Sequence, residues 1–387
     1  MKQQKFLAAA LAGLLLTGCA GCAAPDEEKA GKAPGKLSVM TWNVHNLFDG
    51  EDNGYEYDEF LKSQGWSAEK YLGRINAISD AIGRIQPQPD IILLQEIESG
   101  KVLEDLSRSL NGGYSQSHFA ANPGAAVGVG IISKYPLSDV KAHSVTVESD
   151  TAPRPVLEAR IEAKDARSSE SFQGGNISQK SLAIFICHWK SKLGGDEATE
   201  STRRASARVI LRRVRELRET EPELGIIIAG DLNQNYDEFY RQNAEMICAL
   251  LPDDPYCALL AAKHPMQLAE KFPWQQSLSV QKDFIVISKN MPPVPDNFPP
   301  GTITFYSPWI RELEDGSYYY KNNWETIDHF LVSHQLFDDT GWEYEKTAIV
   351  NIPPFANESG IPAPYSSRTG LGMSDHLPLM LFLAMKD

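Results

Sequence analysis

Several apolar runs of this sequence begin or end at an acid, an amide or a histidine. These side chains are Asn43 after SVMTW, Glu96 after IILLQ, His188 after AIFIC, Asp231 and Asn233 after IIIAG, Asp328 at the start of DHFLV, and Asp375 and His376 before LPLMLFL. Taken singly, each has an ordinary structural interpretation, such as a turn former, a helix cap or a core histidine. In α/β folds, however, ligands bind where strand ends gather, so the repetition predicts that these side chains share one site.

Carboxylate, amide and imidazole groups brought together in this way could hydrolyse a phosphate ester. In-line displacement at phosphorus needs an activated water, neutralised phosphoryl oxygens and a stabilised leaving oxygen. The carboxylates would favour a hard cation, Mg²⁺ in the first place and Mn²⁺ or Ca²⁺ as alternatives, over a metal that prefers thiolates. The sequence contains no GxSxG motif that would offer a competing serine nucleophile.

The elements that must position these residues follow an α/β pattern. Strands are expected at KLSVMTWNV, PDIILLQEI, VGVGIIS, PVLEARIEA, SLAIFICHW, LGIIIAGDL, TIDHFLVS and LPLMLFLAM. One helix is expected over residues 67–86 with one apolar face, formed by Leu72, Ile75, Ile78, Ile82 and Ile85. Ser201–Thr220 predicts a second helix, and the long stretch 236–325 should contain helices and at least one hairpin. Many strands with interspersed helices favour a layered α/β sandwich.

The composition limits the classes of function. The chain has 387 residues, 42% of them hydrophobic, and a formal net charge of −14. Such an acidic chain has no broad basic footprint for holding nucleic acid through counterion release, although a metal-dependent nuclease is not excluded. We expect a single catalytic domain over residues 37–387, acting as a monomer.

The N-terminus predicts export and a lipid anchor. MKQQK is a basic segment, FLAAALAGLLL is an apolar segment too short to span a bilayer, and LTGC follows. We therefore expect a lipoprotein signal over residues 1–18, lipidation of Cys19 and a flexible tether over residues 19–36. An ordinary secretory signal is the alternative. The expected location is the cell envelope, with the domain outside the cytoplasm and bound to the membrane through Cys19.

The remaining cysteines leave one question open. Cys187 lies in the apolar run SLAIFICHW and is expected to be a buried thiol. Cys248 and Cys257 flank ALLPDDPY, and an oxidising compartment would permit a disulfide between them. Two separate thiols are the alternative.

Six motifs, in this order, resemble the endonuclease/exonuclease/phosphatase superfamily, whose fold is DNase I-like: TWNVHNLF, LLQEIE, HWKSK, GDLNQN, IDHFLVS and SDHLPL. GDLN and SDH together are a specific signature, and the likeness spans essentially the whole chain after the tether. It implies a four-layered sandwich of two packed mixed β-sheets flanked by helices, which agrees with the layered pattern above.

The resemblance also implies roles. The metal ligands would be Glu96, Asn43 and Asp375, and Asp231 would position or deprotonate the attacking water. Asn233 and His188 would donate hydrogen bonds to phosphate oxygens. Asp328 would hold His376 and keep it cationic. One departure argues against a DNase I-type mechanism with two histidines and two acids: no Asp or Glu occurs between Asp105 and Asp139, where a partner for His188 would be expected.

The segment from His188 onward is similar to that of secreted bacterial nucleases in the superfamily. Lys190 and Arg204 are candidate phosphate contacts, as is Arg154, for which a structural salt bridge is an equal alternative. A nuclease acting on extracellular DNA or RNA is therefore the leading hypothesis. A phosphatase or a sphingomyelinase-like lipid phosphodiesterase is the second, and the aromatic segment DGSYYYKNNW could then contact membranes. The third is a surface-binding lipoprotein whose catalytic site is retired.

Overall fold

The computed structural model describes residues 35–147, 152–161, 181–262, 281 and 283–386, all within one compact unit. The expected signal peptide and Cys19 lie outside the described residues. Among the helices that the structure describes, none combines the length and apolarity needed to cross a membrane.

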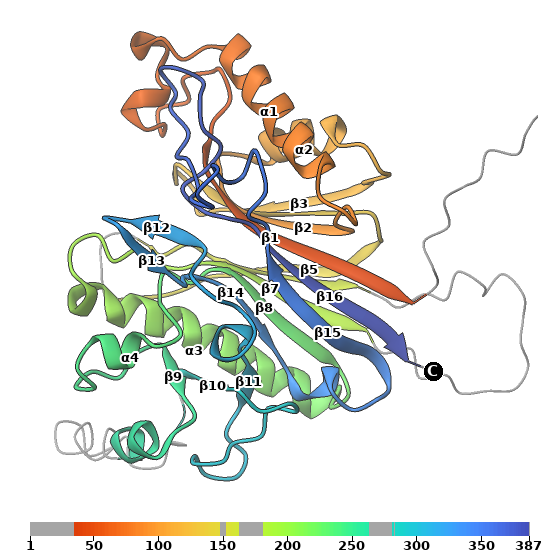
Figure 1. The fold of residues 1–387 in the computed structure, drawn as a ribbon, viewed down its shortest axis with the longest axis vertical. Helices are drawn as coiled ribbons and strands as arrows, with labels where there is room; N and C mark the ends of the chain where they lie inside the picture. The colour runs from red at the N-terminus through yellow and green to blue at the C-terminus, as the bar shows by residue number, and fades with distance from the viewer. Residues whose placement is uncertain (1–34, 148–151, 162–180, 263–280, 282, 387) are drawn as a thin grey trace, which may run out of the picture. The chain divides into compact units, whose positions relative to one another are not determined.

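Two large sheets form the centre of the described fold, and both mix parallel and antiparallel strands (Figure 1). Within the described residues, the first sheet has six strands in the order β15 (Gly341–Ile349), β16 (Leu379–Lys386), β1 (Lys36–Leu47), β2 (Ile91–Ile97), β4 (Gly128–Ser133) and β3 (Gln116–Ala120). The second has eight, in the order β5 (Leu137–His143), β6 (Val156–Ile161), β7 (Leu182–His188), β8 (Gly225–Asp231), β14 (Asp328–Val332), β11 (Thr304–Tyr306), β10 (Ile285–Ser288) and β9 (Leu250–Pro252).

Helices cover the outer faces of both sheets. α1 (Ala68–Gly83) and α2 (Gly100–Ser109) lie against the first sheet, and α3 (Asp196–Thr220) lies against the second (Figure 1). Both α1 and α2 begin at a serine, Ser67 and Ser99, whose hydroxyl accepts a backbone N–H of the first turn. The described residues also form the short α4 (Glu238–Arg241), four 3₁₀ turns and a separate hairpin, β12 (Tyr318–Tyr320) with β13 (Asn323–Glu325).

Among the described residues, three of the four buried apolar clusters separate the layers. Alternate residues of one strand enter different cores: Leu93 packs between the two sheets, whereas Leu94 packs beneath α1 and α2. The third core joins Phe185 of β7 to Val214 of α3. This alternation, with both faces of central strands such as β7 and β8 buried, explains the continuous apolar runs of those strands. The predicted four-layered sandwich of two mixed sheets flanked by helices is confirmed.

The structure corrects one expectation about local structure and answers one question that the sequence left open. Leu72, placed by its spacing on the buried face of the first helix, is 56% exposed, and Tyr71 and Arg74 take the buried positions beside it. Cys248 and Cys257 are both buried free thiols, so the structure contains the two separate thiols and not the disulfide. The expectation of a helix and a hairpin within residues 236–325 is confirmed by α4 and β12–β13.

Candidate active site

A cavity of about 640 Å³ opens at the ends of β2, β7 and β8. Its wall combines acids, cations and tyrosines: Asn46, Tyr57, Glu96, Arg154, His188, Ser191, Lys192, Leu193, Gly194, Asp196, Asp231, Asn233, Tyr318, Tyr320, Glu325, Ile327, Asp375 and His376. The structure therefore brings six of the eight side chains expected to share a site onto one wall. The other two, Asn43 and Asp328, are buried and make hydrogen bonds to side chains of that wall.

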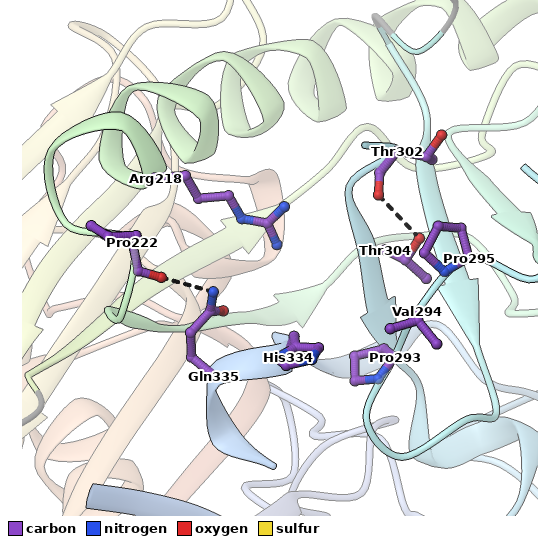
Figure 2. A pocket seen from close by; sticks show the side chains of 9 residues that line it. All are labelled: Arg218, Pro222, Pro293, Val294, Pro295, Thr302, Thr304, His334 and Gln335. Carbon is purple, nitrogen blue, oxygen red and sulfur yellow. Dashed lines mark hydrogen bonds between the residues drawn. The ribbon is translucent and has the colours of Figure 1, made fainter. Parts of the chain in front are cut away.

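A second cavity of about 300 Å³ lies at the far end of α3, beside Arg218 and His334. Figure 2 shows its wall, which consists of prolines, threonines, Val294, Gln335 and these two basic residues. No carboxylate among the described residues lines it, so this described wall lacks the hard oxygen ligands that a divalent cation prefers. The first cavity is therefore the candidate active site.

Asn43 connects two carboxylates at the base of the site. Its Nδ2 donates to Glu96 Oε1 at 3.1 Å and to Asp231 Oδ2 at 3.1 Å, while its Oδ1 accepts the backbone N–H of His45 at 3.0 Å. The N–H of His45 can only donate, and this fixes the orientation of the amide. In this orientation Asn43 holds the two acids in place, and its expected role as a metal ligand stays a prediction.

Glu96 reaches the cavity because β2 is irregular at this residue. Glu96 has a φ of 65°, and the pairing of β2 with β4 shifts register between Gln95 and Ile97. Without that shift, alternation would place Leu94 and Ile97 on opposite faces, whereas both belong to the core beneath α1 and α2. The extra residue releases the Glu96 side chain from the sheet. Its Oε2 then accepts the backbone N–H of Asn46 at 3.0 Å.

Asp328 and His376 form a buried ion pair behind the cavity. Nδ1 of His376 lies 2.8 Å from Oδ2 of Asp328, which also accepts the hydroxyl of Ser317 at 2.6 Å. Burial alone would lower the pKa of His376, but the charge and hydrogen bond of Asp328, with the charges of Asp375 and Asp231, raise it to about 10. His376 is therefore cationic at neutral pH, with Nε2 facing the cavity. This is the arrangement that the resemblance implied.

Asp231 lies between the two histidines. Its Oδ2 is 3.6 Å from Nε2 of His188 and 4.0 Å from Nε2 of His376, and its Oδ1 accepts the backbone N–H of Asn233 at 2.8 Å. Burial raises the pKa of Asp231 to about 7, against the opposing charge of His376. A carboxylate poised near neutral pH is suited to accept a proton from water.

His188 differs from His376 in its charge. Burial, with the positive charges of Arg154 and His376, holds the pKa of His188 well below its usual value. Its Nδ1 is buried and has no hydrogen-bond partner among the described residues. His188 is therefore a neutral imidazole. Asn233, 9% exposed, lies beside it and donates from Nδ2 to the carbonyl of Trp189.

Two acids of the cavity wall offer oxygen ligands for a divalent cation. The side chains of Glu96 and Asp375 are partly exposed, at 19% and 23%, and both supply hard oxygen donors. Ligand atoms of Asp231, Asp328 and His376 also lie within 4.8 Å of one another. That second set fits a cation poorly, because His376 uses Nδ1 for Asp328 and carries a proton, whereas a ligating histidine must be neutral.

The predicted basic contacts divide into two groups. Arg154 lines the cavity, as does Lys192, whose Nζ lies 2.5 Å from Glu238 and 3.3 Å from Glu325. Arg204 does not line it and pairs with Asp283 through Nη2 at 2.8 Å. Lys190 is exposed and is also absent from the cavity wall. The structure thus brings Arg154 to the site and does not bring Lys190 or Arg204.

Sequence reasoning missed the contribution of the β12–β13 hairpin. Tyr318 and Tyr320 line the cavity, and Tyr319 packs edge-on against Trp324 with ring centroids 5.0 Å apart. The aromatic run YYY was the only signal, and its interpretation as a membrane contact overlooked the site. Tyr57, in the acidic stretch after β1, lines the cavity as well and gave no signal.

Comparison with known protein families gives one match. The family model described as Endonuclease/Exonuclease/phosphatase family matches residues 38–261, more than half of the chain. No curated protein matches the sequence.

Similar solved structures include a family protein of the same description from Bacteroides thetaiotaomicron, with 14% identity, a TM-score of 0.47, and coverage of 92% of this chain and 96% of that chain. Truncated Caenorhabditis elegans TDP2 shows 14% identity and a TM-score of 0.47, covering 90% of this chain and 98% of that chain. A mannosyl-6-phosphatase of B. thetaiotaomicron shows 15% identity and a TM-score of 0.46, with 90% and 99% covered. The family model carries the assignment: the chain belongs to the endonuclease/exonuclease/phosphatase family, which hydrolyses phosphate esters.

Proposed function

We propose that this protein is a metal-dependent phosphoesterase that hydrolyses its substrate by direct attack of water. The observation that carries the proposal is the position of Asp231. Its Oδ2 lies within 4.0 Å of Nε2 of a neutral histidine and Nε2 of a cationic one. This arrangement sets a proton acceptor beside donors for phosphate oxygens, which is the combination that phosphoryl transfer to water requires.

The side chains then divide the work. Asp231, oriented by Asn43, accepts a proton from the attacking water at Oδ2. His376, held by Asp328, donates from Nε2–H to a phosphoryl oxygen, where negative charge develops. The second N–H of the Asn233 amide is available for another oxygen, because the first is bonded to Trp189. Neutral His188 completes this wall of the site.

Glu96 and Asp375 would hold the cation. When bound, a divalent metal supplies charge neutralisation at the phosphoryl and leaving oxygens. Asn46 fixes the Glu96 carboxylate through its backbone N–H, so one ligand is oriented before any cation arrives.

For the substrate we propose a phosphodiester of nucleic acid outside the cytoplasm, with the domain tethered to the cell envelope through a lipidated Cys19. Arg154 and Lys192 on the cavity wall support an anionic substrate. A small phosphoester is the second candidate, because Asp196 and Glu325 line the same wall and would repel a long polyanion. A volume of about 640 Å³ is also typical of small-ligand pockets.

The test is a substrate panel. The purified protein is incubated with plasmid DNA, RNA, sphingomyelin and a set of phosphomonoesters, each with Mg²⁺, Mn²⁺, Ca²⁺ or EDTA, beside Asp231→Ala and His376→Ala. EDTA-sensitive cleavage of nucleic acid, lost in both variants, is the expected result. Turnover of a monoester or a lipid alone would change the proposed substrate to that class, and the proposed active site would still hold. Inactivity of the folded protein on every substrate would favour the third alternative, a surface-binding lipoprotein with a catalytically inactive site.

A further inference from the structure

The start of the β12–β13 hairpin contacts both members of the Asp328–His376 pair. Ser317 donates its hydroxyl to Asp328 Oδ2 at 2.6 Å. The ring of Tyr318, the next residue, lies over the imidazole of His376, with centroids 4.6 Å apart and planes inclined by 35°. The backbones are joined as well: the N–H of Leu377 donates to the carbonyl of Ser317 at 2.7 Å, and Tyr318 forms an antiparallel bridge with His376.

We propose that Tyr318 is a positioning residue for the proposed hydrolysis: its ring covers one face of the His376 imidazole and fixes the plane in which Nε2 points at the phosphoryl group. The expected effect of Tyr318 on hydrolysis rests on the proposed function. The geometric part, in which the orientation of His376 depends on the ring of Tyr318, can be tested separately.

A second contact is needed because the hydrogen bond to Asp328 fixes only one atom of the imidazole. With Nδ1 held at 2.8 Å, the ring can still tilt about that bond and move Nε2 across the cavity. A flat aromatic surface against one face removes that freedom. A cationic imidazole is also attracted to the face of a tyrosine ring, and covering that face excludes water that would weaken the ion pair.

The ring, and not the hydroxyl, carries this role. Burial and the charges of Asp375 and Glu325 raise the pKa of Tyr318, so its hydroxyl stays protonated. No contact in the structure joins that hydroxyl to Asp328 or to His376. Phenylalanine at position 318 should therefore preserve the positioning, and leucine, which has similar bulk but no flat face, should not.

The experiment compares Tyr318→Phe, Tyr318→Leu and Tyr319→Leu in the otherwise unchanged protein. Tyr319 is the matched control, because it lies on the same hairpin but packs against Trp324 and is absent from the cavity wall. The measurements are kcat and KM with bis(p-nitrophenyl) phosphate and Mg²⁺, and ¹⁵N–¹H correlation spectra of the histidine rings without metal. The His376 signals are assigned by their loss in His376→Gln.

Tyr318→Leu is expected to lower kcat by about tenfold or more with little change in KM, and to shift the His376 ring signals. Tyr318→Phe and Tyr319→Leu should resemble the original protein in both measurements. Two results would overturn the proposal: unchanged His376 signals in Tyr318→Leu, or equal losses in Tyr318→Phe and Tyr318→Leu. If the original protein hydrolyses no phosphoester, the proposed function fails, while the ring spectra still decide whether Tyr318 positions His376.

Discussion

Nδ1 of His376 lies 2.8 Å from the carboxylate of Asp328, and both side chains are buried. Asp328→Asn keeps the shape of this contact and removes the charge that keeps His376 protonated. We expect kcat to fall by about 10²–10³-fold, since a charged donor to the transition state is lost. Steady-state kinetics at pH 7 provide the measurement, with circular dichroism to verify the fold. Full activity of Asp328→Asn would show that the charge of His376 is not used.

The orientation of Asn43 predicts that its substitution affects kcat more than the metal requirement. Asn43 donates to Glu96 and Asp231 through Nδ2, and its Oδ1 accepts the backbone N–H of His45. Asn43→Ala should therefore lower kcat by about 10²-fold or more, because the proton acceptor loses its orientation. It should alter the metal concentration needed for half-maximal activity much less than Glu96→Gln does. A larger metal effect in Asn43→Ala than in Glu96→Gln would identify Asn43 as a metal ligand.

Metal removal should abolish activity reversibly. EDTA followed by Mg²⁺ or Mn²⁺ is expected to restore hydrolysis, since Glu96 and Asp375 offer hard oxygen ligands. Glu96→Gln and Asp375→Asn should each raise the required metal concentration by about tenfold or more, because a neutral amide replaces a charged ligand. Calorimetric titration with Mn²⁺ measures the same loss without turnover. Unaltered Mn²⁺ binding in both variants would place the cation elsewhere.

Glu158 predicts a loss of stability in acid. Its carboxylate joins β6 to α3, accepting from Nε of Arg213 at 2.8 Å, and lies 2.6 Å from Nε2 of His143. Burial raises the pKa of Glu158, but the hydrogen bonds and charges of His143 and Arg213 outweigh it and lower that pKa to about 2. The ionised Glu158 therefore stabilises the fold fully at pH values above 4.5, the ordinary pKa of a glutamate. This stabilisation is lost as the pH falls from 4.5 towards 2.

Glu158→Gln tests this contribution in urea unfolding. At pH 7 the substitution should lower the free energy of unfolding by about 2 kcal/mol, since Arg213 loses its buried partner. The difference from the original protein should shrink as the pH approaches 3. Glu216→Gln is the control, because its exposed carboxylate contacts the same arginine at 3.1 Å and should change stability by less than about 0.5 kcal/mol. A pH-independent effect of Glu158→Gln would contradict the assignment.

Strand ends were predictable from sequence because local patterns determine them. An apolar run that stops at a polar residue, as at His188 and Asp231, indicates both a buried strand and its exit from the core. Parallel β7 and β8 then bring these two residues into direct register. The pairing of Asp328 with His376 came from the resemblance to the superfamily, since the two residues lie 48 positions apart and no local sequence pattern indicates their contact.

The remaining features depend on contacts that periodicity does not encode. The amide of Asn43 is oriented by a backbone N–H two residues ahead, and the motif is the same for either orientation. Arg204 has the spacing of a phosphate contact but lies beside Asp283, in a segment with no predicted position. Leu72 follows the helical period, yet a buried Arg74 bonded to the carbonyl of Val44 takes the inward place.

Because β2 is irregular at Glu96, the reactive side chain at this position is independent of the packing of the strand in the core. A side chain in a regular strand belongs to one packed face, so exchanging it disturbs the neighbours that surround it. Glu96 stands outside that alternation, and a change of reacting group there leaves Leu94 and Ile97 in the same core. Its φ of 65° still restricts the choice, since branched side chains are strained in that conformation. The packing of the core can therefore stay the same while the ligand at position 96 is changed, by evolution or by design, among the few residue types that this backbone conformation accepts.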